Sequence, residues 1–189
     1  MNAVIEAIKS RRSVRKLLAD PPVSKEQVET IIEAAIWAPN HYLTEPWRFV
    51  VLTGDERRKL GDAMSTALMN TSTESPTQER LDIERNRPLS ASMIIALISS
   101  PKVGNNILLQ EEMVAAGAAL QNMLLVAHSL GLGAMVRTGS HAYSEAIKKF
   151  FEMREGEGLV GLIYLGHIAE PPLLGRRRGT TEKVIWRGA

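Results

Sequence analysis

The 189-residue chain contains no cysteine. This absence excludes disulfide bonds, thiolate-ligated metal ions, iron–sulfur clusters and a cysteine nucleophile. The four histidines are scattered along the chain, with no carboxylates at the spacings that metal sites use. We therefore expect no metal site. The lack of cysteine is compatible with a reducing compartment, and we expect a cytoplasmic protein.

Long apolar runs and aromatic residues are also scarce. No stretch reaches the roughly 18 consecutive apolar residues of a membrane-spanning helix, and the apolar start at residues 1–8 is too short for a secretory signal. Aromatic residues make up 5% of the chain, and none stands between the clustered arginines, so stacking platforms for single-stranded nucleic acid are lacking. We expect no membrane and no nucleic-acid partner. The alternative is that the basic ends of the chain bind RNA or DNA. The net charge of only +2 argues against it.

Several common catalytic and nucleotide-binding motifs are missing. There is no P-loop sequence and no Gly-x-Ser-x-Gly elbow, which argues against a P-loop nucleotidase and a serine hydrolase of that kind. The glycine-containing turn at residues 131–134 follows an expected helix and precedes an expected strand. The Rossmann fingerprint has the opposite order, because it follows a strand and opens a helix. The turn is therefore not a dinucleotide-binding site of that type.

Residues 9–16 are the most distinctive stretch that the chain does contain. They hold five basic side chains and two serines with no acid among them, namely Lys9, Arg11, Arg12, Arg15 and Lys16 with Ser10 and Ser13. Guanidinium groups present a planar fork of donors that matches phosphate oxygens, and serine adds a short donor. A second basic run, residues 176–178, lies near the C-terminus. The two runs could converge on one phosphate; a solvated basic surface is the other interpretation.

Apolar periodicity predicts helices alternating with single strands. Helices are expected at residues 2–10, between Ser24 and Pro39, and at 55–69, 107–130 and 143–151; strands are expected at 49–52, 92–100, 134–138 and 159–168. Residues 70–90 are expected to be a mobile loop with a solvated helix, and residues 169–189 a basic arm. This pattern predicts a single α+β domain over residues 1–189, with one modest sheet covered by helices.

Local signals mark some of these helix ends. Ser24 with Gln27 predicts a capping box, Asp55 predicts an N-cap, and Gly131 predicts a left-handed stop. The helix at 107–130 is apolar almost all round, which is typical of a central helix. Its run of small residues at 115–119 allows close approach either of a neighbouring helix or of a second subunit.

Four motifs follow one another along the chain. They are Arg11-Arg12-Ser13-x-Arg15, Ala38-Pro39-Asn40-His41-x-x-x-Glu45-Pro46-Trp47, Gly131-Leu132-Gly133-Ala134-x-x-Arg137-Thr138-Gly139 and Val160-Gly161-x-x-Tyr164-x-Gly166. Their order and spacing resemble the nitroreductase family of flavoproteins, and the chain length is similar to that of its small members. The chain departs from many members at Asn40, Leu43 and Glu45, where a Ser and an Asn-x-Gln-Pro-Trp sequence are common.

The resemblance implies a three-layer fold with a central, mostly antiparallel sheet, in an intertwined homodimer that binds two FMN molecules at its interface. In such proteins the Arg-x-Ser segment binds the ribityl chain and phosphate, and the next basic residue, here Arg15, lies near the pyrimidine edge of the ring. A cation there favours reduction, because the reduced ring is anionic at N1. The cofactor-binding residues implied in this way are Arg11, Arg12, Ser13, Arg15, Pro39, Asn40 and His41 from the other subunit, Val136, Arg137, Thr138, and Arg176 and Arg178 from the arm.

The implied activity is that of an FMN-dependent oxidoreductase. NADH or NADPH reduces the flavin in a ping-pong cycle, and a small oxidant such as a nitroaromatic, a quinone or an enone is reduced in turn. The flavin carries the chemistry, so no obligatory acid or base is expected; His41 is a candidate proton donor, with a structural role as the alternative. The segment 70–90 would cover the active site, and Trp47 is expected to pack rather than stack on flavin. A flavin-binding or flavin-handling protein without general reductase turnover is the alternative function.

Overall fold

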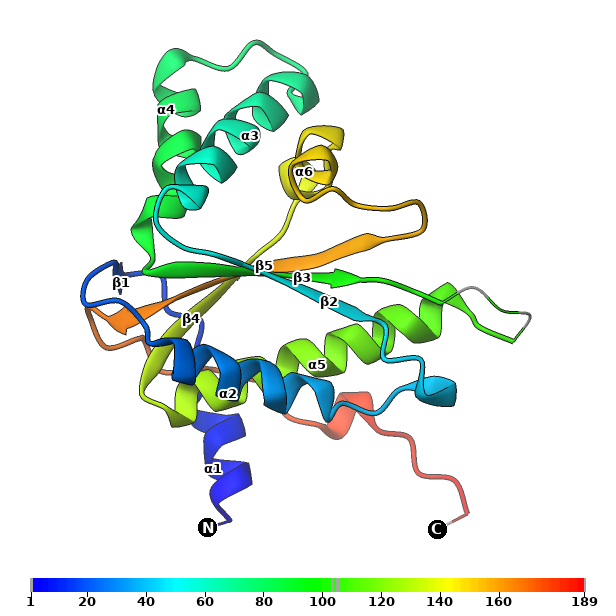
Figure 1. Cartoon of the computed structure of the whole chain (residues 1–189). Helices are drawn as coiled ribbons and strands as arrows, with labels where there is room; N and C mark the ends of the chain where they lie inside the picture. The colour runs from blue at the N-terminus through cyan, green and yellow to red at the C-terminus, as the bar shows by residue number, and fades with distance from the viewer. Residues whose placement is uncertain (1, 103, 105, 189) are drawn as a thin grey trace.

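A central sheet separates two layers of helices in the computed structural model, which describes residues 2–102, 104 and 106–188 (Figure 1). The strands are β1 (Leu17–Leu18), β2 (Trp47–Leu52), β3 (Met93–Ser99), β4 (Leu132–Arg137) and β5 (Gly158–Ile168). The helices are α1 (Ala3–Ser10), α2 (Lys25–Ile36), α3 (Glu56–Thr71), α4 (Gln78–Asn86), α5 (Leu109–Ser129) and α6 (Glu145–Phe150). The expected α+β class and the layered arrangement are confirmed.

The long strand β5 organises the sheet. It pairs with β3, β4 and the two-residue β1, and β2 extends the sheet from β3; all these pairings are antiparallel, as expected. A parallel bridge joins Ser13 to Ala134 of β4, and the Val14 N–H donates to the Ala134 carbonyl oxygen at 2.9 Å. The basic segment 9–16 is therefore held against the sheet rather than left as a free loop.

Burial of both faces of β3 explains why this strand is apolar from Met93 to Ile98. Successive side chains of a strand point to opposite faces, so a strand covered on both sides buries every residue. Met93, Ile95 and Leu97 pack with α2 and α5 in one core layer. Ile94, Ala96 and Ile98 pack with α3 and α6 in the other. Trp47 packs at the edge of the first layer, as expected.

The helix boundaries follow local chemistry in most places. The capping box is confirmed: the Gln27 N–H donates to Ser24 Oγ at 3.2 Å, and the Ser24 N–H donates to Gln27 Oε1 at 3.0 Å. Gly131 adopts the expected left-handed conformation, with φ +73°. Asp55 occupies the N-cap position of α3, as expected, but its side chain makes no capping hydrogen bond, because its backbone is helical instead of extended. β1 was not expected, because two residues carry no periodicity.

Two further expectations need correction. The helix expected at 143–151 divides into a 3-10 turn, Ser140–Tyr143, and α6, because the Ser144 side chain caps the later start. The long helix α5 is not covered all round, since Leu109, Met113 and Val114 are 65%, 42% and 67% exposed. Its N-terminal half thus presents apolar side chains to the surface of the single chain.

Helix α4 packs closely on α3. A Cβ atom at Gly61 of α3 would overlap the backbone carbonyl of Arg85 in α4, so the two helices touch through a position without a side chain. Most residues of α4 are nevertheless solvated, as expected. The mobility of the segment 70–90 stays a prediction.

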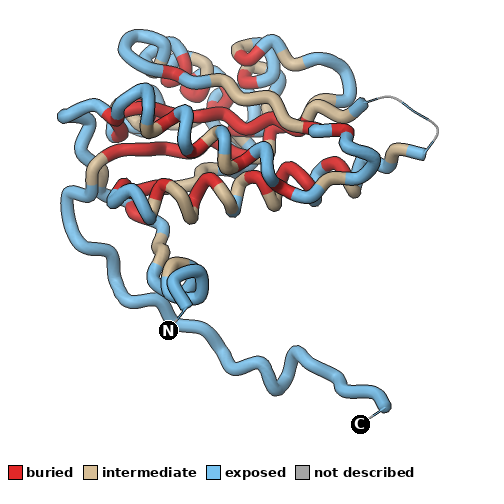
Figure 2. Tube along the Cα trace, turned by 60° about the horizontal axis from the view of Figure 1, so that its bottom comes forward, coloured by how far each residue is buried: buried red, intermediate tan, exposed pale blue. Residues whose placement is uncertain are grey.

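The two ends of the chain lie outside the packed layers. Figure 2 shows α1 and the C-terminal segment leaving the body of the molecule, with the C-terminal segment exposed along its course. Among the described residues from 170 onward, the only regular element is a 3-10 turn, Thr181–Lys183. This segment, residues 169–188, is called the arm below.

Candidate functional site

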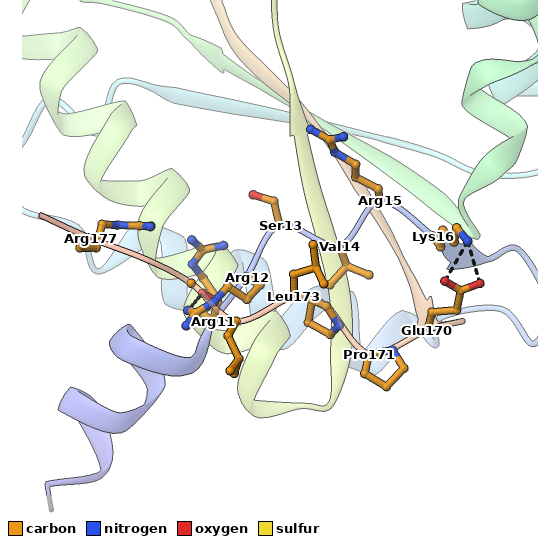
Figure 3. A pocket seen from close by; sticks show the side chains of 13 residues that line it. Arg11, Arg12, Ser13, Val14, Arg15, Lys16, Glu170, Pro171, Leu173 and Arg177 are labelled. Atoms are coloured by element: carbon orange, nitrogen blue, oxygen red, sulfur yellow. Dashed lines mark hydrogen bonds and ion pairs between the residues drawn. The ribbon is translucent and has the colours of Figure 1, made fainter.

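A cavity of about 530 Å³ lies between the basic segment and the first part of the arm (Figure 3). One wall is formed by Arg11, Arg12, Ser13, Val14, Arg15 and Lys16. The other wall is formed by Glu170, Pro171, Pro172, Leu173, Leu174, Gly175 and Arg177. Pairing of Ser13 with β4 fixes the first wall, and the course of the arm past it forms the second.

The cavity carries unbalanced positive charge. Within the part of the chain that the structure describes, no carboxylate forms an ion pair with Arg11, Arg12, Arg15 or Arg177. Lys16 is the exception, because its Nζ lies 2.7 Å from Glu170 Oε1. Burial lowers the pKa of Arg11, and the charges of Arg12 and Arg177 lower it further. This wall therefore carries excess positive charge, which favours binding of a phosphate group.

The guanidinium groups are not spread evenly. In Figure 3, Arg11, Arg12 and Arg177 gather at one end of the cavity, while Arg15 lies farther along and points toward the sheet. Arg12 donates to the backbone oxygens of Lys9 and Arg11 at 2.6 and 2.7 Å, which holds its side chain in place. A Cβ atom at Gly175 would overlap the Arg12 guanidinium, so the arm passes close to this side chain at a residue that has none of its own.

The end of β4 adds another cation beside this cavity. The Arg137 guanidinium lies 5.0 Å from the centre of the Tyr164 ring, in a cation–π contact. Its Nε is buried and has no hydrogen-bond partner among the described residues. Burial lowers the pKa of Arg137, and the positive charges of Arg87 and Arg15 lower it further. Tyr164 and Glu84 act in the opposite direction and raise it. Arg87 is paired with Glu84 at 2.8 Å, so Arg137 keeps an uncompensated charge.

A second cavity, of about 540 Å³, lies at the start of α5. It is lined by Pro39, Asn40, His41, Leu108, Gln110, Glu111, Val114 and Ala115. The adjoining loop is strained, because three non-glycine residues, Tyr42, Leu43 and Glu45, have φ of 51°, 53° and 47°. Each such residue costs roughly 1 kcal/mol or more.

The strained loop is fastened at three points. Thr44 Oγ1 donates to Glu112 Oε1 at 2.7 Å, and the Glu45 N–H donates to Asn40 Oδ1 at 3.0 Å. His41 Nδ1 also lies 3.5 Å from Glu111 Oε2. The loop therefore has one preferred shape, although Tyr42 and Leu43 themselves are exposed.

The single chain brings together only part of the expected site. Arg11, Arg12, Ser13 and Arg15 share the cationic cavity, whereas Pro39, Asn40 and His41 line the cavity at α5. Val136, Arg137 and Thr138, at the end of β4, line neither of these two cavities. From the arm, Arg177 lines the cationic cavity, and Arg176 and Arg178 do not. Roles for Arg176 and Arg178 on the phosphate stay predictions.

Sequence reasoning missed two features of this region. It named Arg176 and Arg178 and passed over Arg177, the arginine of this run that lines the cationic cavity. It also missed the Thr44–Glu112 contact, for which the sequence carries no signal.

Within the described ranges, no group of three or more histidine and carboxylate side chains is placed to hold a metal ion. The helices of those ranges include none that is long and apolar enough to span a membrane.

Comparisons with known proteins concern the family and the fold. The family model described as "Nitroreductase family" matches residues 8–167. The chain is 28% identical over 162 residues, 86% of each chain, to YdjA of Escherichia coli K12, which is named as a candidate NAD(P)H nitroreductase. The fold is similar to a nitroreductase-like family protein from Bacillus cereus, with a TM-score of 0.84 at 28% identity over 100% of this chain and 98% of that one. It is also similar to a candidate nitroreductase from Desulfovibrio desulfuricans that was solved in complex with FMN, with a TM-score of 0.76 at 29% identity over 100% and 99% of the two chains.

Proposed function

Because the chain belongs to the nitroreductase family, we propose that it reduces nitroaromatics, quinones or related small acceptors with NADH or NADPH through bound FMN. The oxidoreductase class and the use of FMN with NAD(P)H, both expected from the sequence, are confirmed at the level of the family. The choice of acceptor and the ping-pong order of the two half-reactions are the finer part of the proposal.

The unpaired guanidinium groups of the cationic cavity are the observation that carries the proposal. FMN bears a phosphate dianion, and charge-assisted bonds from arginine to phosphate are among the strong hydrogen bonds of proteins. Arg11, Arg12 and Arg177 gather at one end of the cavity, with the Ser13 hydroxyl beside them. Burial lowers the pKa of Arg11 most, and repulsion from Arg12 and Arg177 lowers it further. The residues present therefore fit the phosphate end of FMN.

The remaining basic residues suit a different part of the cofactor. FMN, when bound, accepts hydride from the nicotinamide and passes reducing equivalents to the acceptor. Arg15 lies apart from the phosphate end and points toward the sheet, so we assign it to the pyrimidine edge, where it would stabilise negative charge on the reduced ring. Arg137 adds to the positive field from the end of β4. His41 stays a candidate proton donor.

The functional unit that we propose is a homodimer. Exposed apolar side chains occur on three separate elements: Val4, Ile5 and Ile8 of α1, Leu109 and Val114 of α5, and Leu173, Leu174 and Trp186 of the arm. Large exposed apolar side chains on several elements are typical of surfaces that contact another protein. A second copy would cover these surfaces and would bring its residues 39–41 to the ring end of the partner's FMN.

A visible spectrum with anaerobic titration tests the proposal. The purified protein is expected to show flavin bands that bleach on addition of NADH or NADPH and return on addition of a quinone. A colourless protein that takes up no FMN would refute it. If FMN binds but neither nicotinamide is oxidised with a quinone or a nitroaromatic, the alternative of a flavin-handling protein without turnover is correct.

A further inference from the structure

Glu112 is a buried carboxylate that the proposed chemistry does not use. It lies in the first turn of α5 and is 1% exposed. Its Oε1 accepts the hydrogen bond from Thr44, while its Oε2 is buried without a hydrogen-bond partner among the described residues. Burying a carboxylate with so few partners is unfavourable, and an apolar side chain would pack there at lower cost. The residue therefore needs an explanation other than core stability.

The segment that Glu112 holds is the strained loop at residues 40–45. Thr44 is 3% exposed and stands between Leu43 and Glu45, both of which have left-handed backbone conformations. Tyr42 and Leu43 are 67% and 78% exposed, so packing of their own side chains does not impose the shape. The buried Thr44–Glu112 bond is thus the central fastening of the loop, and the adjacent His41–Glu111 contact reinforces it from the same helix.

We infer that Glu112 is a positioning residue, which acts through Thr44 to set the loop that presents His41 and Tyr42 to the acceptor. The inference rests on the proposed function, in which this loop completes the site of the partner subunit. The phosphate end of FMN is held in the separate cationic cavity. Loosening the loop should therefore impair use of the acceptor much more than binding of FMN.

The variants Thr44→Val and Thr44→Ser separate the hydroxyl from the shape of the side chain. In the FMN-loaded protein, Thr44→Val is expected to lower kcat/KM for a benzoquinone and for nitrobenzene about tenfold, the scale of one lost hydrogen bond to a charged group. The dissociation constant of FMN, measured by fluorescence, should change less than about twofold. In the FMN-free protein, amide hydrogen exchange at residues 44 and 45 should become faster. Thr44→Ser, which keeps the hydroxyl group, should leave all three quantities close to their wild-type values.

Two controls make the outcomes distinct. Glu112→Gln, which keeps the size and one acceptor oxygen, should give a smaller loss than Thr44→Val. Ile147→Val, a change in the other core layer, destabilises the fold without touching the loop. If it reproduces the loss of kcat/KM, the effect is general destabilisation and the inference is overturned.

Three other results would each decide on the inference or on the proposed function. A wild-type protein that binds FMN and reduces quinone, with a Thr44→Val variant unchanged in kcat/KM and in amide exchange, overturns the inference and leaves the proposed function standing. A Thr44→Val variant that loses FMN affinity as strongly as acceptor turnover overturns it too. A wild-type protein that neither binds FMN nor reduces an acceptor refutes the proposed function, and the positioning role with it.

Discussion

Replacing Arg11 with Gln should change two properties of the protein in opposite directions. Arg11 lines the cationic cavity beside Arg12 and Arg177, and no carboxylate among the described residues pairs with it. With FMN bound, its guanidinium donates to the phosphate in the proposed arrangement. Without FMN, the same group is repelled by its neighbours. Arg11→Gln should therefore weaken FMN binding and stabilise the FMN-free protein.

The two effects differ in size. A hydrogen bond to a charged group contributes about 1.5–3 kcal/mol, so the dissociation constant of FMN should rise about 10- to 150-fold. Repulsion between partly exposed guanidinium groups is screened by solvent and is worth roughly 0.5 kcal/mol. For a chain of this length that corresponds to an increase in the Tm of the FMN-free protein of about 1–2 °C.

Flavin fluorescence titration and thermal unfolding of the FMN-free protein measure both quantities on the same preparations. Arg177→Gln should behave like Arg11→Gln, whereas Arg176→Gln and Arg178→Gln serve as matched controls outside the cavity lining. An unchanged dissociation constant in Arg11→Gln would refute the assignment of this residue to the phosphate. A loss of affinity in Arg176→Gln or Arg178→Gln that exceeds the loss in Arg177→Gln would show that the arm takes a different course around the cofactor.

Three further predictions concern the fold, its response to acid and its assembly. Gly61→Ala should lower the free energy of unfolding by about 3 kcal/mol or more in urea titrations, because the added Cβ overlaps the backbone of α4; an unchanged midpoint would contradict the close packing of α3 on α4. Burial alone would raise the pKa of Glu157, but hydrogen bonds from Arg48 and Arg154 outweigh it and lower the pKa to about 2. The charged form is thus favoured by folding, so the wild type should lose about 2 kcal/mol between pH 5 and pH 2 that Glu157→Gln does not lose, and equal losses in the two proteins would count against the network. Val114→Glu, at an exposed position of α5, should give a folded monomer by light scattering with weakened FMN binding; a variant that stays dimeric would show that this surface lies outside the interface.

Much of the secondary structure could be predicted because its causes are local. The buried strand β3 is apolar from Met93 to Ile98, and the capping box of Ser24 and Gln27 involves residues three apart. Prediction failed where the local signal is too short, as in β1, which comprises only Leu17 and Leu18. At Asp55 the position of the N-cap was predicted, but the helical backbone leaves the side chain without a capping hydrogen bond.

The candidate site divides in the same way. Charge alone left residues 9–16 open between a phosphate site and a solvated basic surface, and the family resemblance favoured the phosphate site. The bridge of Ser13 to Ala134 shows how the sheet holds that segment. The exposed face at the start of α5 could not be predicted, because an apolar helix looks the same whether its core or a second subunit covers it. That the site is shared between two subunits therefore stays a proposal.

The sequence by itself indicated the family, through four motifs in order, and it showed the clusters of basic residues near both ends of the chain. Tertiary structure alone decided which of three adjacent arginines lines the cavity, because this depends on the course of the arm past the basic segment. It also decided that Thr44 would meet Glu112, a residue 68 positions away. Contacts of this kind depend on how segments distant in the sequence pack together, and this packing cannot be predicted from residue type and spacing.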